Sequence, residues 1–491
     1  MDKIVNLKLW PEKYRVHLKL LFYFIVYRSF QYLLILVGPN EQFDTSTIIF
    51  LRKVTPEANS TINNFWNHNL WNKLLSWDSI FFIKGITKEL LDSPEYEFEL
   101  MFSRIWVQCV RFLLKCMNIS MIKENFYVIL KFTILLENLL HFSSVLLIYH
   151  LTLSVYAEVT ATGKLVTKYT QNIATLASIL FIFTSGSGFF ISIYSEPFSF
   201  FLTFIGIYIR EICLVKSQNT YSNISLQLKD GVYPFIYLVG STSMFTLATL
   251  NRSNCILLGL FYLYDLLCLI LNLTTKNKSL PILRQIILGP LLSGMTMLMI
   301  IVYFWYYIPF NEFCPSGGEW CNSSLFNGVN STYFITRQSF YSYVQGKYWN
   351  VGFLNYWTLS NIPNFLIGMP QFLILVKSIQ YFFHKYKKYG VNGKHTIIPL
   401  IMITIFLILV ILFVAHVQII NRVSTFIPLH LWYISELIVS QGLRNSDSSF
   451  SDKSKKPGSK FDLLLIKLYL GWLFFWIPIQ TILFGVFLPP A

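Results

Sequence analysis

IIPLIMITIFLILVILFVAHV, residues 397–417, is an apolar run that contains no acidic residue, lysine or arginine. A run of about 20 apolar residues is long enough to cross the hydrocarbon core of a bilayer as a helix. Similar runs recur along the whole chain, and no long polar block separates them. The sequence therefore predicts an all-α polytopic membrane protein, folded as one membrane domain over residues 1–491.

The composition agrees with this class. Hydrophobic residues make up 54% of the chain and charged residues only 13%, whereas about a quarter of an average soluble domain is charged. Eleven stretches have the length and character of membrane-spanning helices. They are approximately residues 19–37, 126–150, 172–190, 197–215, 233–250, 254–273, 284–307, 362–383, 397–417, 426–440 and 463–487.

The basic residues are unevenly placed between these stretches. A formal net charge of +15 is compatible with a nucleic-acid partner, but Lys and Arg occur mostly in short loops between apolar runs. Such loops resist translocation and stay in the cytosol. If the N-terminus is cytosolic, the short luminal connections contain only Arg252 and Arg422. The pattern predicts a cytosolic N-terminus and no nucleic-acid partner.

Two predicted luminal segments are too long and too polar to be simple connections. Residues 38–124 include the run 105–116, which is apolar but interrupted by Arg111 and Lys115. This run predicts a helix that lies in the membrane interface. Residues 309–360 are dense in aromatic side chains, which favour the headgroup zone. A further polar stretch, residues 441–460, predicts a solvated cytosolic linker.

Cysteines and glycosylation sequons in the luminal segments fit the secretory pathway. Cys314 and Cys321 flank a short polar segment and are candidates for a disulfide in an oxidising lumen. Other sequons fall in predicted cytosolic loops, so the motif alone does not establish a luminal side. Four sequons would be luminal and open to glycosylation, at Asn59, Asn118, Asn322 and Asn330.

The first candidate site is Ser76-Trp77-Asp78-Ser79, which follows the first span on the luminal side. The carboxylate of Asp78 could act as general base toward a sugar hydroxyl, with Trp77 supporting the sugar ring. The plainer alternative is a solvated loop Asp beside an interfacial Trp. Glu97 and Glu99, with Glu95, could assist the base, position a hydroxyl or hold a metal, although an acidic run is usually a solvated surface.

Two further ionisable residues fall at the predicted luminal membrane surface, where such side chains are functional candidates. Arg252 could bind a lipid phosphate through a bidentate contact. Glu196, at the start of the fourth span, could be the salt-bridge partner of Arg252 or cap the following helix. A purely structural ion pair is the alternative for both residues.

A third cluster runs from Tyr341 to Asn364, and Arg422 and His430 follow later in the chain. Amides, Tyr and Trp are interleaved in it, which suits a glycan, because sugar hydroxyls need hydrogen bonds and apolar ring faces stack on aromatic rings. An aromatic belt that anchors the protein in the membrane is the alternative. The substrate-binding candidates of this region are Tyr343, Gln345, Trp349, Asn350, Asn364, Arg422 and His430.

No Walker loop, zinc-ligand cluster or GxSxG elbow is present. Ser185-Gly186-Ser187-Gly188 lies in an apolar run, where close helix packing is a better interpretation than phosphate binding. The sequence predicts no metal site and no cofactor, and it leaves a metal requirement open.

Taken in order, these stretches resemble the PIG-V type family, the fungal GPI mannosyltransferases 2. The resemblance covers nearly the whole chain. It is carried by SWDS at 76–79, SEPFSF at 195–200, ATLNRSN at 248–254, YVQGKYWNVGFLNYW at 343–357, NIPNF at 361–365 and FLPPA at 487–491.

The resemblance implies a GT-C type fold in the endoplasmic reticulum membrane, with a luminal active site. It implies transfer of mannose from dolichol-phosphate-mannose to the second position of the GPI precursor, in α1,6 linkage and by a single inverting displacement. Asp78 would be the general base. In some animal members an acid and a His closely follow this Asp, whereas Ser79 and Ile80 stand here. The resemblance also suggests a small membrane partner subunit.

Two alternatives remain open at this stage. The nearer one is another dolichol-phosphate-sugar transferase of the same fold, acting on protein or on the N-glycan precursor. The more distant one is a membrane transporter or lipid scramblase, in which ionisable groups gather near the bilayer midplane. The clusters identified above gather instead at the predicted luminal face.

Overall fold

The computed structural model describes residues 12–55, 64–91, 97–102, 104–160, 163–165, 167–215, 226–275, 279–314, 319–322, 339–389, 394–446 and 460–489. Glu95, the sequons at Asn59 and Asn330, and most of the predicted linker 441–460 lie outside these residues. The regular structure that is described is helical, apart from one short antiparallel hairpin. Its strands are β1 (Glu158–Thr160) and β2 (Gly163–Leu165), with Val159 paired to Lys164.

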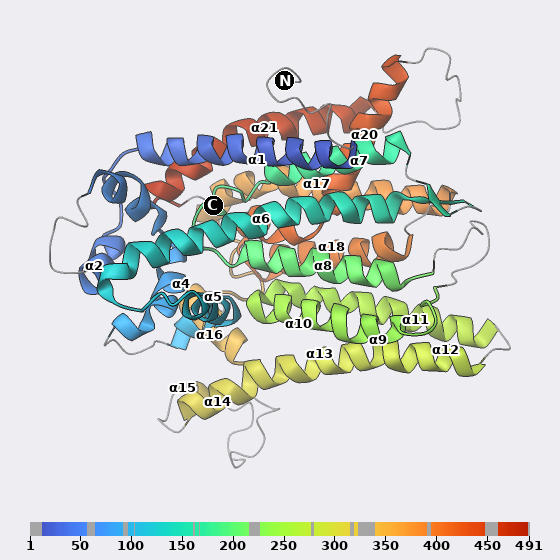
Figure 1. Cartoon of the computed structure of the whole chain (residues 1–491), viewed down its shortest axis with the longest axis horizontal. Helices are drawn as coiled ribbons and strands as arrows, with labels where there is room; N and C mark the ends of the chain where they lie inside the picture. The colour runs from blue at the N-terminus through green and yellow to red at the C-terminus, as the bar shows by residue number, and fades with distance from the viewer. Residues whose placement is uncertain are drawn as a thin grey trace.

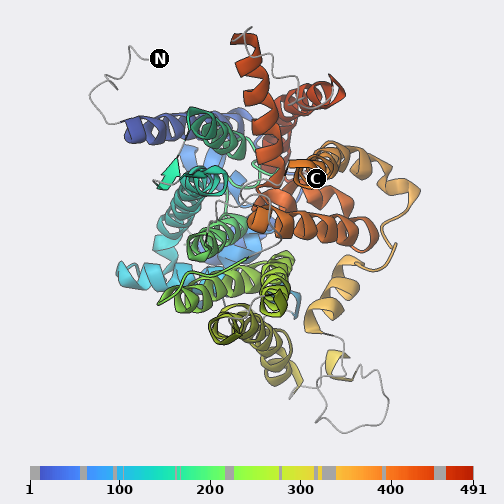
Figure 2. The ribbon, with the colours of Figure 1, turned by 90° about the vertical axis from the view of Figure 1, so that its right-hand side faces the viewer.

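Helices that share one general direction form the body of the molecule. They are α1 (Glu12–Val37), α6 (Phe126–Tyr156), α7 (Lys168–Ile182), α8 (Glu196–Cys213), α10 (Thr242–Asn251), α11 (Gly259–Thr275), α12 (Ser279–Ile286), α13 (Leu292–Val302), α17 (Ile362–Tyr389), α18 (Lys394–Phe413), α20 (Leu429–Ser446) and α21 (Lys460–Gly485). They run along the longest axis of the molecule (Figure 1) and form a bundle when seen from its end (Figure 2). α6 packs against α7 and α8, α10 packs against α8, and α17 packs against α18.

The predicted membrane spans all coincide with helices. Among the described residues, seven helices are long and apolar enough to cross a membrane, and an eighth candidate is a pair, Val417–Phe426 and Leu429–Gly442, bent by 77°. The other three predicted spans fall on α7, α8 and the segment of α10. α7 has only 15 residues, and α8 carries the charged residues Glu196, Arg210 and Glu211. The all-helical, multi-pass class is therefore confirmed, with seven or eight helices that qualify against the eleven predicted.

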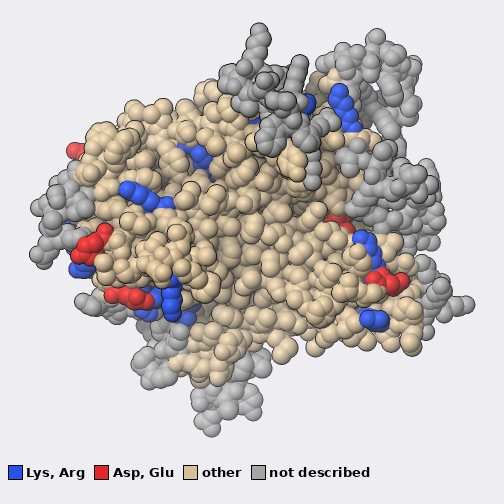
Figure 3. All heavy atoms as spheres, viewed as in Figure 1, with Lys and Arg blue, Asp and Glu red and all other residues tan. Residues whose placement is uncertain are grey.

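Short helices gather at one end of the bundle. α2 (Ser46–Val54), α4 (Ser79–Ile86), α5 (Arg104–Cys116) and α16 (Phe340–Trp349) lie together at the left of Figure 1, whereas the β strands, the last turn of α11 and the first turn of α12 lie at the opposite end. α5 confirms the helix predicted over residues 105–116, and its apolar face is buried. On the face drawn in Figure 3, charged side chains lie toward the two ends, and the middle is largely uncharged. Such a belt suits the hydrocarbon core of a bilayer.

The predicted aromatic luminal segment is described in part. Cys314, after α14 (Ile308–Phe313), and Cys321, in α15 (Glu319–Asn322), are joined by a disulfide. Trp320 and Phe340 belong to a small apolar cluster beside it, with ring centroids 5.2 Å apart. α16 then packs against the short helix η5 (Glu97–Met101) of the first luminal segment. The two predicted luminal segments therefore meet at the same end of the bundle.

A buried ion pair ties the long helices together. Arg210 of α8 donates to both carboxylate oxygens of Asp265 in α11, at 2.7 and 2.5 Å. The hydroxyl of Tyr237 donates to the same carboxylate at 2.6 Å. Because a buried charge is costly unless it is paired and hydrogen-bonded, this network fixes how α8 lies on α11.

A buried lysine positions the segment that leads to Asp78. Lys73 is 2% exposed, and its ammonium donates to the carbonyl oxygens of Ile35 (3.0 Å) and Gly38 (2.7 Å) at the end of α1. The last carbonyls of a helix have no partner within it, and a positive charge is favourable there. The contact holds the residues before Asp78 against the end of α1.

Candidate active site

Asp78 immediately precedes α4, at the end of the bundle that carries the short helices. Two serines fix the turn around it. Ser76 Oγ donates to the carbonyl of Lys73 (3.0 Å), and Ser79 Oγ donates to the carbonyl of Ser76 (2.6 Å). Both serines are buried, whereas the Asp78 side chain is 28% exposed. The turn thus presents one accessible carboxylate on a rigid backbone.

Asp78 belongs to a chain of four alternating charges. Arg422, in α19 (Ile420–Val423), contacts Asp78 Oδ2 through Nη1 at 3.1 Å. Its Nε lies 2.9 Å from Glu196 Oε1, at the start of α8. Glu196 also pairs with Arg252, between α10 and the following helix. Sequence positions that are far apart therefore converge on one ion-pair chain, Asp78–Arg422–Glu196–Arg252.

Aromatic rings hold Arg422 in place within this chain. Its guanidinium carbon lies 5.1 Å from the ring centroid of Phe189 and 5.4 Å from that of Tyr194. A guanidinium over a ring face is attracted by the ring electrons, more strongly where water is excluded. Arg422 is thus fixed by two carboxylates and two rings, which limits the positions that the Asp78 carboxylate can take.

The serine-glycine stretch 185–188 allows α19 to come this close. A Cβ atom on Gly186 would lie 3.0 Å from Arg422 Cα and 3.1 Å from the carbonyl oxygen of Asn421. Ser185 Oγ donates to that same oxygen at 2.7 Å. The close packing predicted for this stretch is found, although the stretch lies in turns after α7 rather than inside a helix, and it places the backbone of Arg422.

The electrostatic setting shifts two groups near Asp78. Burial, and then the neighbouring Arg422, lowers the pKa of Arg252 to about 10, so Arg252 remains charged at neutral pH. Burial, and then the charge of Asp78, raises the pKa of Tyr194 well above its ordinary value. Tyr194 therefore contributes a neutral ring beside the charged chain.

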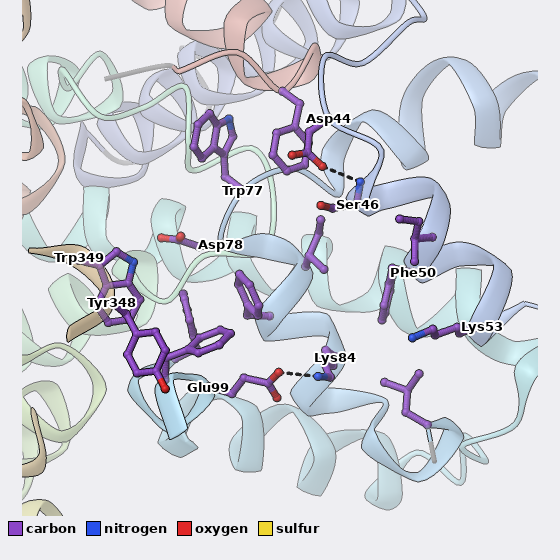
Figure 4. Close-up of a pocket in the computed structure, with 17 residues that line it drawn as sticks. Asp44, Ser46, Phe50, Lys53, Trp77, Asp78, Lys84, Glu99, Tyr348 and Trp349 are labelled. Carbon is purple, nitrogen blue, oxygen red and sulfur yellow. Dashed lines mark hydrogen bonds and ion pairs between the residues drawn. The ribbon is translucent and has the colours of Figure 1, made fainter. Parts of the chain in front are cut away.

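A cavity of about 720 Å³ opens beside Asp78. Figure 4 shows Asp78 between Trp77 and Trp349, with Tyr348 next to Trp349. The cavity has the size of a typical small-ligand site. Its lining comes from α2, α4, η5, α16 and the residue Phe487 after α21. The lining side chains are Asp44, Ser46, Ile49, Phe50, Lys53, Trp77, Asp78, Ile80, Phe81, Lys84, Leu91, Phe98, Glu99, Phe102, Tyr348, Trp349 and Phe487.

The charged side chains of the cavity differ in their partners. Lys84 and Glu99 form an ion pair across it (Figure 4). Asp44 Oδ1 accepts a hydrogen bond from the backbone N–H of Ser46 at 2.6 Å, at the start of α2. Lys53, further along α2, lines the cavity without an acidic partner among the described residues. The cavity thus offers the Asp78 carboxylate at one position and, at another, an ammonium with no acidic partner in the described part of the chain.

The remaining predicted residues are only partly brought to the cavity. Glu97 accepts a hydrogen bond from the hydroxyl of Tyr348 at 3.2 Å and so supports the cavity wall from behind. Tyr343, Gln345 and Asn350 lie on or just after α16 but do not line the cavity, and neither does Asn364, whose amide donates to the hydroxyl of Tyr356 at 2.7 Å. His430 is 2% exposed within α20 and also lies outside the lining.

Sequence reasoning missed part of the site. Asp44, Lys53 and Lys84 belong to short helices and turns of the first luminal segment, where no motif marks them. Tyr348 adjoins Trp349 and is the residue that the aromatic pattern should have included. Tyr194 directly precedes the SEPFSF stretch. Among the described residues, no group of three or more His, Cys, Asp and Glu side chains could hold a metal ion.

Residues 16–491 match the family described as Mannosyltransferase (PIG-V). The chain is 42% identical to GPI mannosyltransferase 2 of Saccharomyces cerevisiae over 469 residues, which cover 96% of this chain and 98% of that protein. It is 43% identical to GPI mannosyltransferase 2 of Candida glabrata over 470 residues, with the same two coverages.

A solved structure with a similar arrangement is the apo oligosaccharyltransferase of Archaeoglobus fulgidus. The TM-score is 0.45 at 11% sequence identity, and the match covers 90% of this chain. The chain spans 55% of the length of that protein.

Proposed function

Because the chain belongs to the PIG-V family of mannosyltransferases, we propose that it transfers mannose from dolichol-phosphate-mannose to the GPI-anchor precursor. The transfer would add the second mannose, in α1,6 linkage, as the resemblance of the motifs to this family implies. The observation that carries the proposal is the place of Asp78, with two arginines on one side and an aromatic cavity on the other.

The arginine side suits the lipid-phosphate donor. Arg252 contacts Glu196 through Nη2, which leaves donors on Nε and Nη1 for another anion. The planar fork of a guanidinium matches phosphate oxygens bidentately. Arg252, aided by Arg422, would bind the donor phosphate and stabilise the charge that develops on it as the glycosidic bond breaks.

The cavity side suits the acceptor glycan. Trp77, Tyr348 and Trp349 offer ring faces for a sugar, and the charged side chains offer hydrogen bonds to hydroxyls. Lys53 lines the cavity and has no acidic partner within the described ranges, and we assign to it the phosphodiester of the inositol phospholipid part of the acceptor. The acceptor would then lie between Lys53 and Asp78.

Asp78 would act as general base. Arg422 engages Oδ2, so Oδ1 is the atom available to an incoming hydroxyl. The acceptor hydroxyl would give its proton to Asp78 while its oxygen forms a bond to C1 of mannose. The bond from C1 to the phosphate oxygen breaks at the same time, and its electron pair leaves with the phosphate. This single displacement converts a β-linked donor into an α-linked product.

The proposed location is the endoplasmic reticulum membrane, with the N-terminus in the cytosol and the site in the lumen. Two observations support this orientation. The basic loops favour the cytosol, and the β strands and the adjoining ends of α11 and α12, which flank such loops, lie at the end opposite the short helices around Asp78 (Figure 1). We also propose the GT-C type of fold and a small membrane partner subunit, as the resemblance implies.

The test is replacement of the cell's own enzyme. Yeast cells depleted of their GPI mannosyltransferase 2 are expected to accumulate the one-mannose GPI precursor. Expression of this chain should clear that intermediate, and expression of the D78N variant at the same level should not. Persistent accumulation with the unaltered chain, together with mannosylation of an N-glycan precursor or a protein, would favour the other dolichol-dependent transferases instead.

A further inference from the structure

The segment that follows α21 forms part of the wall of the cavity. Phe487 lines the cavity and stacks on Trp77, with ring centroids 5.3 Å apart and ring planes inclined by 29°. The indole Nε1 of Trp77 donates to the carbonyl oxygen of Leu488 at 3.2 Å, across 411 positions of sequence. Trp77, which directly precedes the proposed base, is therefore held on its face and at its edge by the same segment.

The segment itself is fixed to the first luminal segment. The backbone N–H of Phe43 donates to the carbonyl of Val486 at 2.9 Å. Gln42 Nε2 donates to the carbonyl of Gly485 (3.3 Å) and to Ser76 Oγ (3.0 Å). A Cβ atom on Gly485 would lie 2.6 Å from Ile35 Cδ1, so a larger residue here would require the Ile35 side chain to move. Phe487 is thus a fixed part of the structure rather than a loose end.

Both stacked residues have an unfavourable backbone conformation. Trp77 has φ of 57° and Phe487 has φ of 61°. Bulky side chains rarely adopt positive φ, and such conformations persist only where the surroundings hold them. Each ring supports the other, and the backbone of Trp77 decides where the Asp78 carboxylate points.

We propose that Phe487 is a positioning residue for the base: its ring and the adjoining Leu488 carbonyl hold Trp77 in the left-handed conformation that keeps Asp78 on Arg422. The proposal rests on the proposed function for its activity readout. It makes the segment after α21 a part of the catalytic machinery, although this segment touches neither reacting atom.

The experiment compares Phe487→Ala with a conservative and a distant variant. Purified protein is assayed with labelled dolichol-phosphate-mannose and one-mannose acceptor. Small misplacements of a catalytic group reduce rates by up to about 100-fold, so Phe487→Ala should lower kcat by about 10- to 100-fold and leave the KM of the donor within about twofold. Phe487→Tyr keeps the aromatic ring and should therefore retain most of the kcat of the unaltered protein. Phe475→Ala is the matched control, because the Phe475 side chain on α21 is 67% exposed. This change should alter neither kcat nor the KM of the donor.

A double-mutant cycle separates positioning from general damage. Because residues in contact do not act additively, the double variant Trp77→Ala, Phe487→Ala should be no slower than Trp77→Ala alone. Additive losses, or no rescue by tyrosine, would overturn the proposal. If the unaltered protein does not consume the one-mannose acceptor, the proposed function fails. The Tm of the unaltered protein, the two single variants and the double variant is then measured instead. Additive Tm changes would still refute the Trp77–Phe487 coupling.

Discussion

One guanidinium holds two carboxylates in this protein: Arg422 contacts Asp78 through Nη1 at 3.1 Å and Glu196 through Nε at 2.9 Å. The contact to Asp78 is to Oδ2 only. One carboxylate oxygen is therefore oriented by the protein, and the other, Oδ1, is the atom to which the proposed function assigns the acceptor hydroxyl. The predictions below follow from this division and from the residues around it.

Asp78→Asn should abolish most transfer. The amide keeps the shape of the side chain but cannot take a proton, and a general base contributes about 10²–10⁴-fold in rate. We expect kcat to fall by that factor while expression and Tm stay unchanged. The measurement is release of mannosylated acceptor from labelled donor in detergent. Glu124→Gln, an exposed carboxylate of the same luminal segment, serves as the control, and near-normal turnover of Asp78→Asn would exclude Asp78 as base.

Arg252→Ala should weaken use of the donor. Hydrogen bonds to charged groups contribute about 1.5–3 kcal/mol, which corresponds to roughly a 10- to 100-fold increase in the KM for dolichol-phosphate-mannose. Arg252→Lys keeps the charge but loses the planar fork of N–H donors. Its KM for the donor should therefore lie between that of the unaltered protein and that of Arg252→Ala. The KM for the acceptor should stay the same. A donor KM unaffected by either change would assign Arg252 to the structural pair with Glu196.

Lys53→Ala should weaken use of the acceptor. An exposed ion pair contributes up to about 1 kcal/mol, so the acceptor KM should rise by about three- to fivefold, with no change in the donor KM. The effect should disappear with a soluble acceptor glycan that lacks the phosphodiester. Arg52→Ala is the matched control, because Arg52 is the neighbouring exposed cation on α2 and does not line the cavity. Equal effects of the two changes would refute a specific contact.

Lys73→Met should destabilise the protein. Its ammonium donates to two carbonyls at the end of α1, and leaving buried acceptors unsatisfied costs about 1–3 kcal/mol. We expect a lower Tm, whereas Lys115→Met, an exposed lysine in α5, should leave Tm unchanged.

The same lysine predicts a pH effect. Burial lowers the pKa of Lys73 below its ordinary value of 10.5, so near that value the unfolded chain binds more protons than the folded chain. The free energy of unfolding therefore rises with pH in that window. The Tm difference between the unaltered protein and Lys73→Met should increase as pH rises toward 10.5, and a decrease would contradict the assigned burial of the charge.

Much of this arrangement could be predicted from single stretches of sequence. Apolar runs predict helices because the backbone N–H and C=O groups of a membrane span must form their hydrogen bonds within the segment itself. Asp78, Glu196 and Arg252 could be identified because ionisable residues at the ends of apolar runs are unusual. The pairing of Glu196 with Arg252, one of the two roles expected for Glu196, is confirmed.

The rest depends on contacts across the fold that no local pattern contains. Arg422 reaches Asp78 only because Gly186 lets α19 approach, and His430, eight positions later in the chain, is buried away from the cavity instead. The stretch 197–215 predicts the helix α8, but it contains no sign of the partner that Arg210 finds in α11. Lys53 lies in a short helix whose position depends on packing rather than on a motif.

The contact between Phe487 and Trp77 also has a consequence for biosynthesis. The wall of the cavity combines residues made early in translation with residues made after α21. A nascent chain can insert most of its helices and still lack a complete pocket. The cavity wall is therefore complete only after the last described helix has been made, and we expect shortened products released before that point to lack the Phe487 side of the wall.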